Sequence, residues 1–246
     1  MATQTWRDSL TAHFPDACPL ADARRWLREQ LDRRYGADRS TILLGTSACS
    51  DDILASKDMS RDFWGPFTLG GLGGLPHCGR TAMQAFAHHV PDNGTALLIY
   101  GPHVGLTRDG VWGWMRRPGQ TCDTKSCGAL MAAVARMEQR KELEELEPDT
   151  SWPGGDDQQQ VFLERVLWPF RARILAAEFP ATEVTKVAYS LVHRQVQHLM
   201  DLARDEFRGA RIVYVGAVVI NTGPDEEDWL EIRDHGVIET GDKVGP

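Results

Sequence analysis

Three residues of the types that bind zinc stand next to predicted secondary-structure elements. Cys49 follows a short apolar run at residues 41–46, and His103 follows a second apolar run at residues 95–100. Cys127 lies where a helix is predicted to begin. Zinc takes thiolate and imidazole ligands in tetrahedral geometry, and two cysteines with one histidine would leave the fourth position open for water. The three side chains are therefore candidates for a catalytic zinc site.

The cysteine usage supports a chemical role for these thiols, although their spacing alone does not establish one. The chain has five cysteines and no visible export signal, which favours metal binding, catalysis or burial over a disulfide framework. We expect the positive end of the helix dipole to lower the pKa of Cys127. The intervals between Cys49, His103 and Cys127 form no compact motif, so buried structural side chains are an alternative interpretation.

Strands and helices alternate in the predicted secondary structure that must hold these residues. Apolar runs predict strands, helical periodicity predicts helices, and the Gly-rich stretch before residue 77 belongs to a predicted long loop. In such α/β folds, ligands bind beyond the carboxyl ends of strands, where Cys49 and His103 stand. The predicted strands are 41–46, 95–100, 211–221 and 229–239, the predicted helices are 21–35, 79–89, 127–146, 160–178 and 181–207, and the predicted loop is 51–76.

The composition and the motifs that are missing exclude several classes of function. A formal net charge of −8 without a basic stripe argues against binding to nucleic acid or to an anionic membrane surface. The longest apolar run, residues 212–220, is too short for a membrane span, which needs about 20 residues. No nucleotide-binding glycine motif and no serine-hydrolase elbow is present. We expect a cytoplasmic protein, or an organellar one if a transit peptide was removed.

Longer motifs around the candidate residues resemble a known family, the limiting CO2-inducible proteins B and C (LCIB/C). Its active members are carbonic anhydrases with a site similar to that of the β-class enzymes. The match is strong over residues 40–135 and looser at VVINTG, residues 218–223. The motifs are CSDD at 49–52, GPFTLGGLGGLP at 65–76, AFAHHVPDNG at 85–94, YGPHVG at 100–105 and SCGAL at 126–130.

The resemblance implies a fold, a metal and a reaction. The fold is an α/β core with a central sheet flanked by helices, resembling the β-carbonic anhydrase core, with extra N- and C-terminal helices. A single zinc domain would span residues 1–246, with an N-terminal helical part at 1–38 and C-terminal helices and a strand at 158–246. Carried over by motif, the Zn2+ ligands are Cys49, His103 and Cys127. The implied reaction is the reversible hydration of carbon dioxide to bicarbonate by zinc-bound hydroxide, in a homodimer.

The resemblance also implies roles for polar residues near the ligands. Asp51 stands two residues after the first cysteine, and in the β-class pattern this Asp pairs with a nearby Arg. Ile53 occupies the position of that Arg here, so we predict Arg61 as the partner of Asp51. His88 of the AHH motif is a candidate proton shuttle, because imidazole titrates in the appropriate range. The alternative is a hydrogen-bonded structural histidine, and His89 competes for the same role.

The departure at Ile53 leaves other functions open. A catalytically silent, zinc-binding family member could act in inorganic-carbon handling. Another zinc hydrolase could use the same activated water on an ester or amide. A redox-sensing thiol protein would respond to oxidant rather than to a chelator. Metal content together with a carbon dioxide hydration assay distinguishes a carbonic anhydrase from these alternatives.

Overall fold

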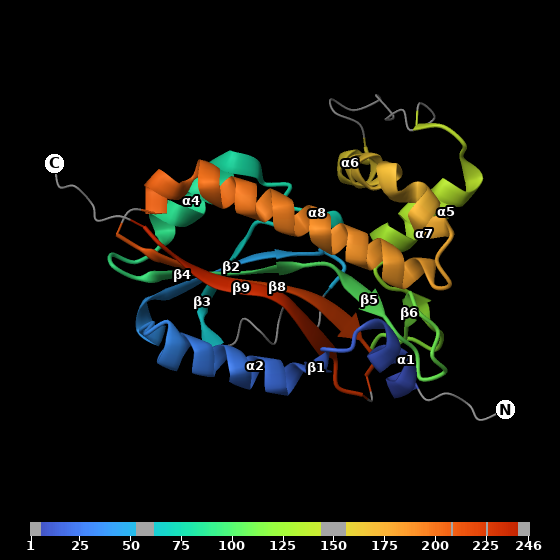
Figure 1. Ribbon diagram of the computed structural model, residues 1–246, viewed down its shortest axis with the longest axis horizontal. Coiled ribbons are helices and arrows are strands. Elements are labelled where there is room, and N and C mark those ends of the chain that lie inside the picture. Colours follow the sequence, from blue (N-terminus) through green and yellow to red (C-terminus); the bar gives the residue numbers. More distant parts are fainter. Residues whose placement is uncertain (1–5, 53–61, 144–155, 208, 225, 241–246) are drawn as a thin grey trace.

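A mixed β-sheet forms the centre of the structure, and helices cover both of its faces (Figure 1). The computed structural model describes residues 6–52, 62–143, 156–207, 209–224 and 226–240. Strands β2, β3, β4 and β8 are parallel, while β9 runs antiparallel to β8 and to β1. The strand order is β1 (Cys18–Pro19), β9 (Trp229–Glu239), β8 (Arg211–Asn221), β4 (Thr95–Gly101), β2 (Ile42–Ala48) and β3 (Trp64–Thr68), with β5 (His103–Gly105) also paired to β8.

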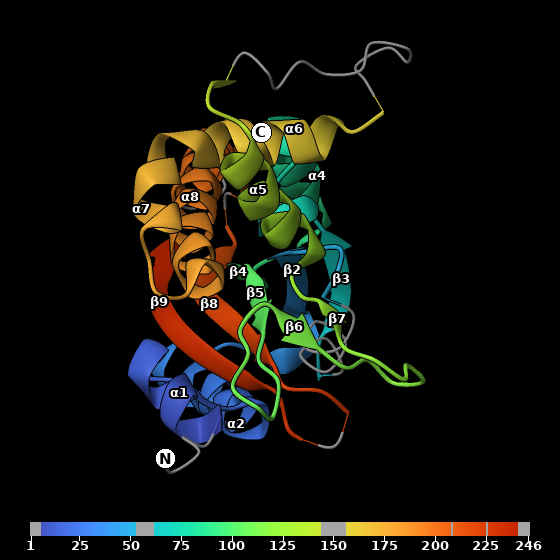
Figure 2. The same ribbon diagram turned by 90° about the vertical axis from the view of Figure 1, so that its right-hand side faces the viewer.

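Two groups of helices lie on opposite faces of the sheet (Figures 1 and 2). The lower face is covered by α1 (Trp6–His13), α2 (Leu20–Glu29) and the π-helical turn η1 (Gln30–Arg34). The upper face carries α4 (Gly79–His89), α5 (Gly128–Gln139), α6 (Gln158–Leu167), α7 (Arg171–Leu175) and α8 (Pro180–Leu202). Short elements are the 3₁₀ turns η2 (Arg39–Thr41), η4 (Leu72–Gly74), η6 (Trp168–Phe170) and η7 (Arg204–Phe207), and the two-stranded sheet of β6 (Trp114–Met115) and β7 (Thr124–Lys125).

The central strands are apolar along most of their length because both of their faces are covered. All but the last residue of β2 are buried, and one face of the sheet packs against Leu27 and Leu31 from the α2 side. The other face packs against α4, α5 and α8, with Phe86 and Leu130 in the same core. This arrangement confirms the predicted α/β fold with a central sheet flanked by helices.

Three parts of the predicted secondary structure differ from the structure. The predicted helix 160–178 is divided into α6, η6 and α7. The helix that begins after Cys127 ends at Gln139, where Arg140 takes an extended conformation, because the charged run that follows lacks an apolar stripe. The predicted loop 51–76 contains β3, an edge strand that includes Pro66. Proline is tolerated on an edge strand, but its presence hides the strand pattern in the sequence.

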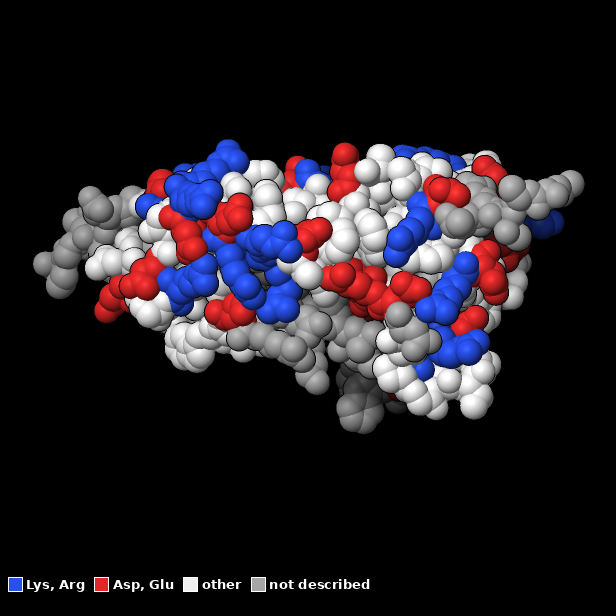
Figure 3. Space-filling model, turned by 90° about the horizontal axis from the view of Figure 1, so that it is seen from below, with Lys and Arg blue, Asp and Glu red and all other residues white. Residues whose placement is uncertain are grey.

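The surface seen from below, on the α2 side, mixes both signs of charge (Figure 3). Arg24 and Arg28 both bind Asp62, and Arg25 pairs with Asp22. These opposite charges therefore compensate one another locally and do not form a patch of one sign.

Across the described part of the chain, the helices are too short or too polar to cross a lipid bilayer.

Candidate metal centre

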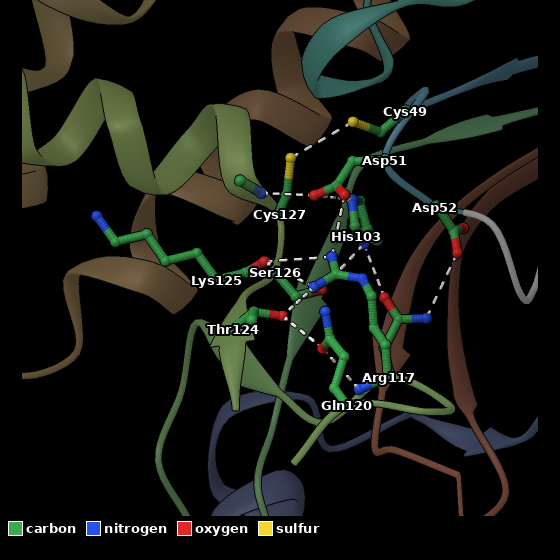
Figure 4. A network of polar contacts seen from close by, with 12 residues as sticks. Cys49, Asp51, Asp52, His103, Arg117, Gln120, Thr124, Lys125, Ser126 and Cys127 are labelled. Carbon is green, nitrogen blue, oxygen red and sulfur yellow. Dashed lines mark hydrogen bonds and ion pairs between the residues drawn. The ribbon is translucent and has the colours of Figure 1, made fainter. Parts of the chain in front are cut away.

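Cys49, His103 and Cys127 converge beyond the carboxyl ends of β2 and β4 (Figure 4). Cys49 follows the last residue of β2, His103 opens β5 just after β4, and Cys127 directly precedes α5. All three side chains are buried, and their ligand atoms lie within 4.8 Å of one another. The Sγ atoms of Cys49 and Cys127 are 3.4 Å apart. The structure therefore brings together the three residues predicted as ligands, in a cluster that could hold a metal ion.

The Gly-rich segment wraps its backbone around this cluster. The Gly73 N–H donates to Cys49 Sγ at 3.3 Å, and Gly73 itself has a φ of 68°, in the left-handed region. A Cβ at Gly74 would lie 2.5 Å from the carbonyl oxygen of Gly101, at the end of β4. Glycine is therefore needed where the 70–76 segment crosses the strand ends at the site.

The two ring nitrogens of His103 have different surroundings. Its Nδ1 lies 2.7 Å from Asn221 Oδ1, while Nε2 is buried without a hydrogen-bond partner among the described residues. The nearest carboxylate oxygen recorded at Nε2 is Asp51 Oδ2, 3.8 Å away. A buried nitrogen without a partner is costly, and a metal ion would satisfy it. Two thiols and this nitrogen form the donor set that suits zinc.

The pKa values of the two thiols are shifted in opposite directions. The hydrogen bond from Cys127 lowers the pKa of Cys49, against the effect of burial. The same contact, together with burial, raises the pKa of Cys127 well above its usual value. The prediction that the helix start lowers the pKa of Cys127 is therefore wrong, because the neighbouring thiolate and complete burial outweigh the helix dipole.

Metal binding at this site should release protons and strengthen as the pH rises. Burial alone would lower the pKa of His103, but Cys49 and Asp52 raise it, to about 9. His103 and Cys127 therefore keep their protons near pH 7, and a metal ion must displace both. With two protons displaced, the zinc association constant should rise by up to about 100-fold per pH unit below pH 9. Chelator-competition titrations at pH 6.5, 7.5 and 8.5 measure this slope, and a pH-independent constant would contradict it.

Asp51 lies beside the three candidate ligands, and both of its carboxylate oxygens are hydrogen-bonded (Figure 4). Arg117 Nη2 donates to Asp51 Oδ1 at 3.0 Å, and the Gly128 N–H donates to Oδ2 at 2.7 Å. Arg61, predicted as the partner of Asp51, lies outside the described residues and stays a prediction. The partner that the structure does describe is Arg117.

Arg117 comes from the segment between β6 and β7 and is itself held in place. Its Nη1 donates to Thr124 Oγ1 at 2.5 Å, and both terminal nitrogens lie 3.2 Å from the Lys125 carbonyl oxygen. Sequence reasoning missed this residue because it is far from Asp51 in the chain. No local motif links Arg117 to Asp51, so the sequence offered no signal for this pair.

His88 lies at the other end of the strands from the cluster. It stands near the carboxyl end of α4, and the chain then returns to the amino end of β4, whereas the cluster lies past the carboxyl end of β4. Its Nε2 is 2.9 Å from Glu206, and its side chain is 62% exposed. The structure thus does not bring His88 to the three candidate ligands, and its shuttle role stays a prediction without geometric support.

Comparison with known proteins identifies the family. The family model described as limiting CO2-inducible proteins B/C beta carbonic anhydrases matches residues 19–239. The chain belongs to this family. The LCIB/C match covers every element that forms the candidate site, from β2 to β9.

Solved structures of LCIB proteins share the fold of this LCIB/C member. PtLCIB4, a homolog of the limiting CO2-inducible protein LCIB, is 29% identical with a TM-score of 0.83, over 94% of this chain and 95% of that chain. The limiting CO2-inducible protein LCIB is 20% identical with a TM-score of 0.68, over 96% of each chain, which shows the shared fold. The comparison with curated proteins gave no match.

Proposed function

We propose that this LCIB/C protein is a zinc-dependent carbonic anhydrase that converts carbon dioxide and water reversibly to bicarbonate. The observation that carries the proposal is the buried Cys49–His103–Cys127 cluster, with the free Nε2 of His103 beside Asp51. Bound zinc would supply a Lewis acid that lowers the pKa of coordinated water. The family description supports this chemistry.

The protein's own residues hold and orient the reacting groups. The thiolates of Cys49 and Cys127 balance the charge of a divalent ion, and His103 contributes a neutral ligand. Asp51 would accept a hydrogen bond from the nucleophilic water and orient it. Arg117 and the Gly128 N–H each hold one oxygen of Asp51, which restrains it from moving in as a fourth ligand. We expect turnover to depend on this restraint, because it keeps the fourth position of the metal open for water.

The surroundings of the cluster suit a small uncharged substrate. Cys49 and Cys127 belong to the same buried apolar cluster as Leu69, Leu75 and Leu130. Apolar surroundings exclude bulk water and offer few hydrogen-bond partners to a bulky polar substrate. This observation favours carbon dioxide over an ester or amide, which would need a wider and more polar pocket.

Metal content and hydration of carbon dioxide, measured on the purified chain, test the proposal. We expect about one zinc per chain and stopped-flow hydration above the buffer rate, lost on chelation and restored by zinc but not by magnesium. A nitrophenyl ester serves as the second substrate and should react far more slowly. Zinc binding without hydration would contradict the enzyme proposal and support the silent zinc-binding alternative. The homodimer, the single domain over residues 1–246 and the cytoplasmic location are proposed on the sequence and the family resemblance.

A further inference from the structure

We infer that Asn221, oriented by Asp228, is a positioning residue that fixes which nitrogen of His103 carries the proton. This inference rests on the metal centre of the proposed function. It concerns a directed chain of hydrogen bonds that runs from the β8–β9 connection to the candidate ligand. Neither Asn221 nor Asp228 is one of the candidate ligands, so both would act through His103.

The chain of contacts is buried throughout. His103 opens β5, and the parallel pairing of β5 with β8 brings Asn221, the last residue of β8, to the same edge of the sheet. Asn221 Oδ1 lies 2.7 Å from His103 Nδ1. On its other side, Asn221 Nδ2 lies 3.2 Å from Asp228 Oδ2 and 3.4 Å from Asp52 Oδ1. All four side chains are less than 10% exposed, so water does not compete for these hydrogen bonds.

The direction of each hydrogen bond follows from the chemistry of the groups. Carboxylates only accept hydrogen bonds, so Asp228 and Asp52 require the NH2 group of the Asn221 amide to face them. The amide oxygen then faces His103 and can only accept, so Nδ1 of His103 must carry a proton. When a metal ion displaces the second proton of the imidazolium, it is therefore the Nε2 proton that leaves, and Nε2 offers its lone pair. This is the buried nitrogen without a hydrogen-bond partner, which faces the candidate metal position.

Asp228 is held firmly enough to set this direction. The N–H of Thr222, the residue after Asn221, donates to Asp228 Oδ1 at 2.9 Å. One carboxylate thus binds both the backbone after β8 and the amide that orients His103. Ser126 Oγ also lies 3.4 Å from His103 Nδ1, but a hydroxyl can donate or accept and so imposes no direction. The two carboxylates are therefore the groups that fix the proton on Nδ1.

The variant Asn221→Leu tests the inference, because leucine keeps the size of the side chain and removes both the acceptor and the donor. We expect the zinc dissociation constant, measured by chelator competition, to rise by about 10- to 100-fold. The second readout is the 1H–15N spectrum of zinc-loaded protein labelled at histidine. Wild type should show a slowly exchanging proton on Nδ1 of His103, and Asn221→Leu should show faster exchange and a shifted Nδ1 resonance.

Asp228→Asn keeps the inference testable if Asn221→Leu fails to fold. The Thr222 N–H still needs the amide oxygen of the new side chain as its acceptor, so the NH2 group turns toward Asn221 and can no longer hold the Asn221 NH2 group, at nearly constant shape. We expect a smaller rise in the zinc dissociation constant and the same change at His103 Nδ1. Asp234→Asn is the matched control, because Asp234 on β9 binds Tyr189 and makes no contact with Asn221 or His103 among the described residues.

If the wild-type chain binds zinc, three results would overturn the inference. They are wild-type zinc affinity in both variants, an unchanged His103 resonance in both, or a wild-type spectrum with the proton on Nε2. A wild-type chain that binds no zinc would overturn the inference together with the metal centre. Zinc binding with the expected spectra but without hydration would overturn only the proposed activity.

Discussion

Changing Cys127 to serine should abolish stable zinc binding and, with it, carbon dioxide hydration. A serine hydroxyl does not ionise near neutral pH and is a poor zinc ligand, so only two protein ligands would remain. The loss in zinc affinity should exceed the roughly 100-fold that marks the upper end for outer-shell contacts. Cys127 is completely buried and serine is nearly the same size, so the fold should survive the change. Zinc content after equilibration in a defined zinc buffer measures the effect.

Cys122→Ser is the matched control, because Cys122 is an exposed thiol in the segment that leads to the same helix. It should keep wild-type zinc content and wild-type hydration. Zinc retained by Cys127→Ser at the wild-type level would show that the metal is held elsewhere. Zinc lost from Cys122→Ser instead would move the thiolate ligand to that position.

The position of Cys49 and His103 at the ends of strands could be predicted from the sequence without the family resemblance. The apolar runs before Cys49 and His103 form β2 and β4, and parallel strands place their carboxyl ends at one edge of the sheet. The start of a helix at Cys127 was also predicted from the sequence. Nothing in the spacing shows that this helix packs against that edge, and the grouping of the three residues came from the family resemblance.

The features that were missed depend on contacts between segments that are distant in the chain. The pKa of Cys127 depends on the neighbouring thiolate of Cys49, just after β2, which outweighs the local helix dipole. The role of Asn221 depends on the pairing of β5 with β8, a register that no local pattern specifies. Arg117 reaches Asp51 only through the fold of the β6–β7 segment. Local propensity does not encode such contacts, so they appear only in the structure.

Changing Arg117 to alanine should lower turnover by about 100-fold while zinc stays bound, because a displaced catalytic group typically costs about this much. Arg117 donates to Asp51 at 3.0 Å and lies largely shielded from solvent, with 16% of its side chain exposed. Without it, the Gly128 N–H is the remaining hydrogen-bond donor to Asp51 among the described residues. The matched control is Arg116→Ala, since Arg116 pairs with Asp123 at the surface and should keep wild-type turnover. Arg61→Ala, made alongside, tests the partner predicted from the sequence.

The double variant Asp51→Ala/Arg117→Ala distinguishes how the arginine acts. If Arg117 restrains Asp51, Asp51→Ala alone should lower turnover at least as far, and the double variant should match it instead of adding a second loss. In Arg117→Ala alone, the released carboxylate can reach the metal, so zinc affinity should stay the same or rise while turnover falls. Additive losses in stopped-flow rates would show that Arg117 acts independently of Asp51. Loss of zinc from Asp51→Ala would make Asp51 a resting ligand rather than the group that orients water.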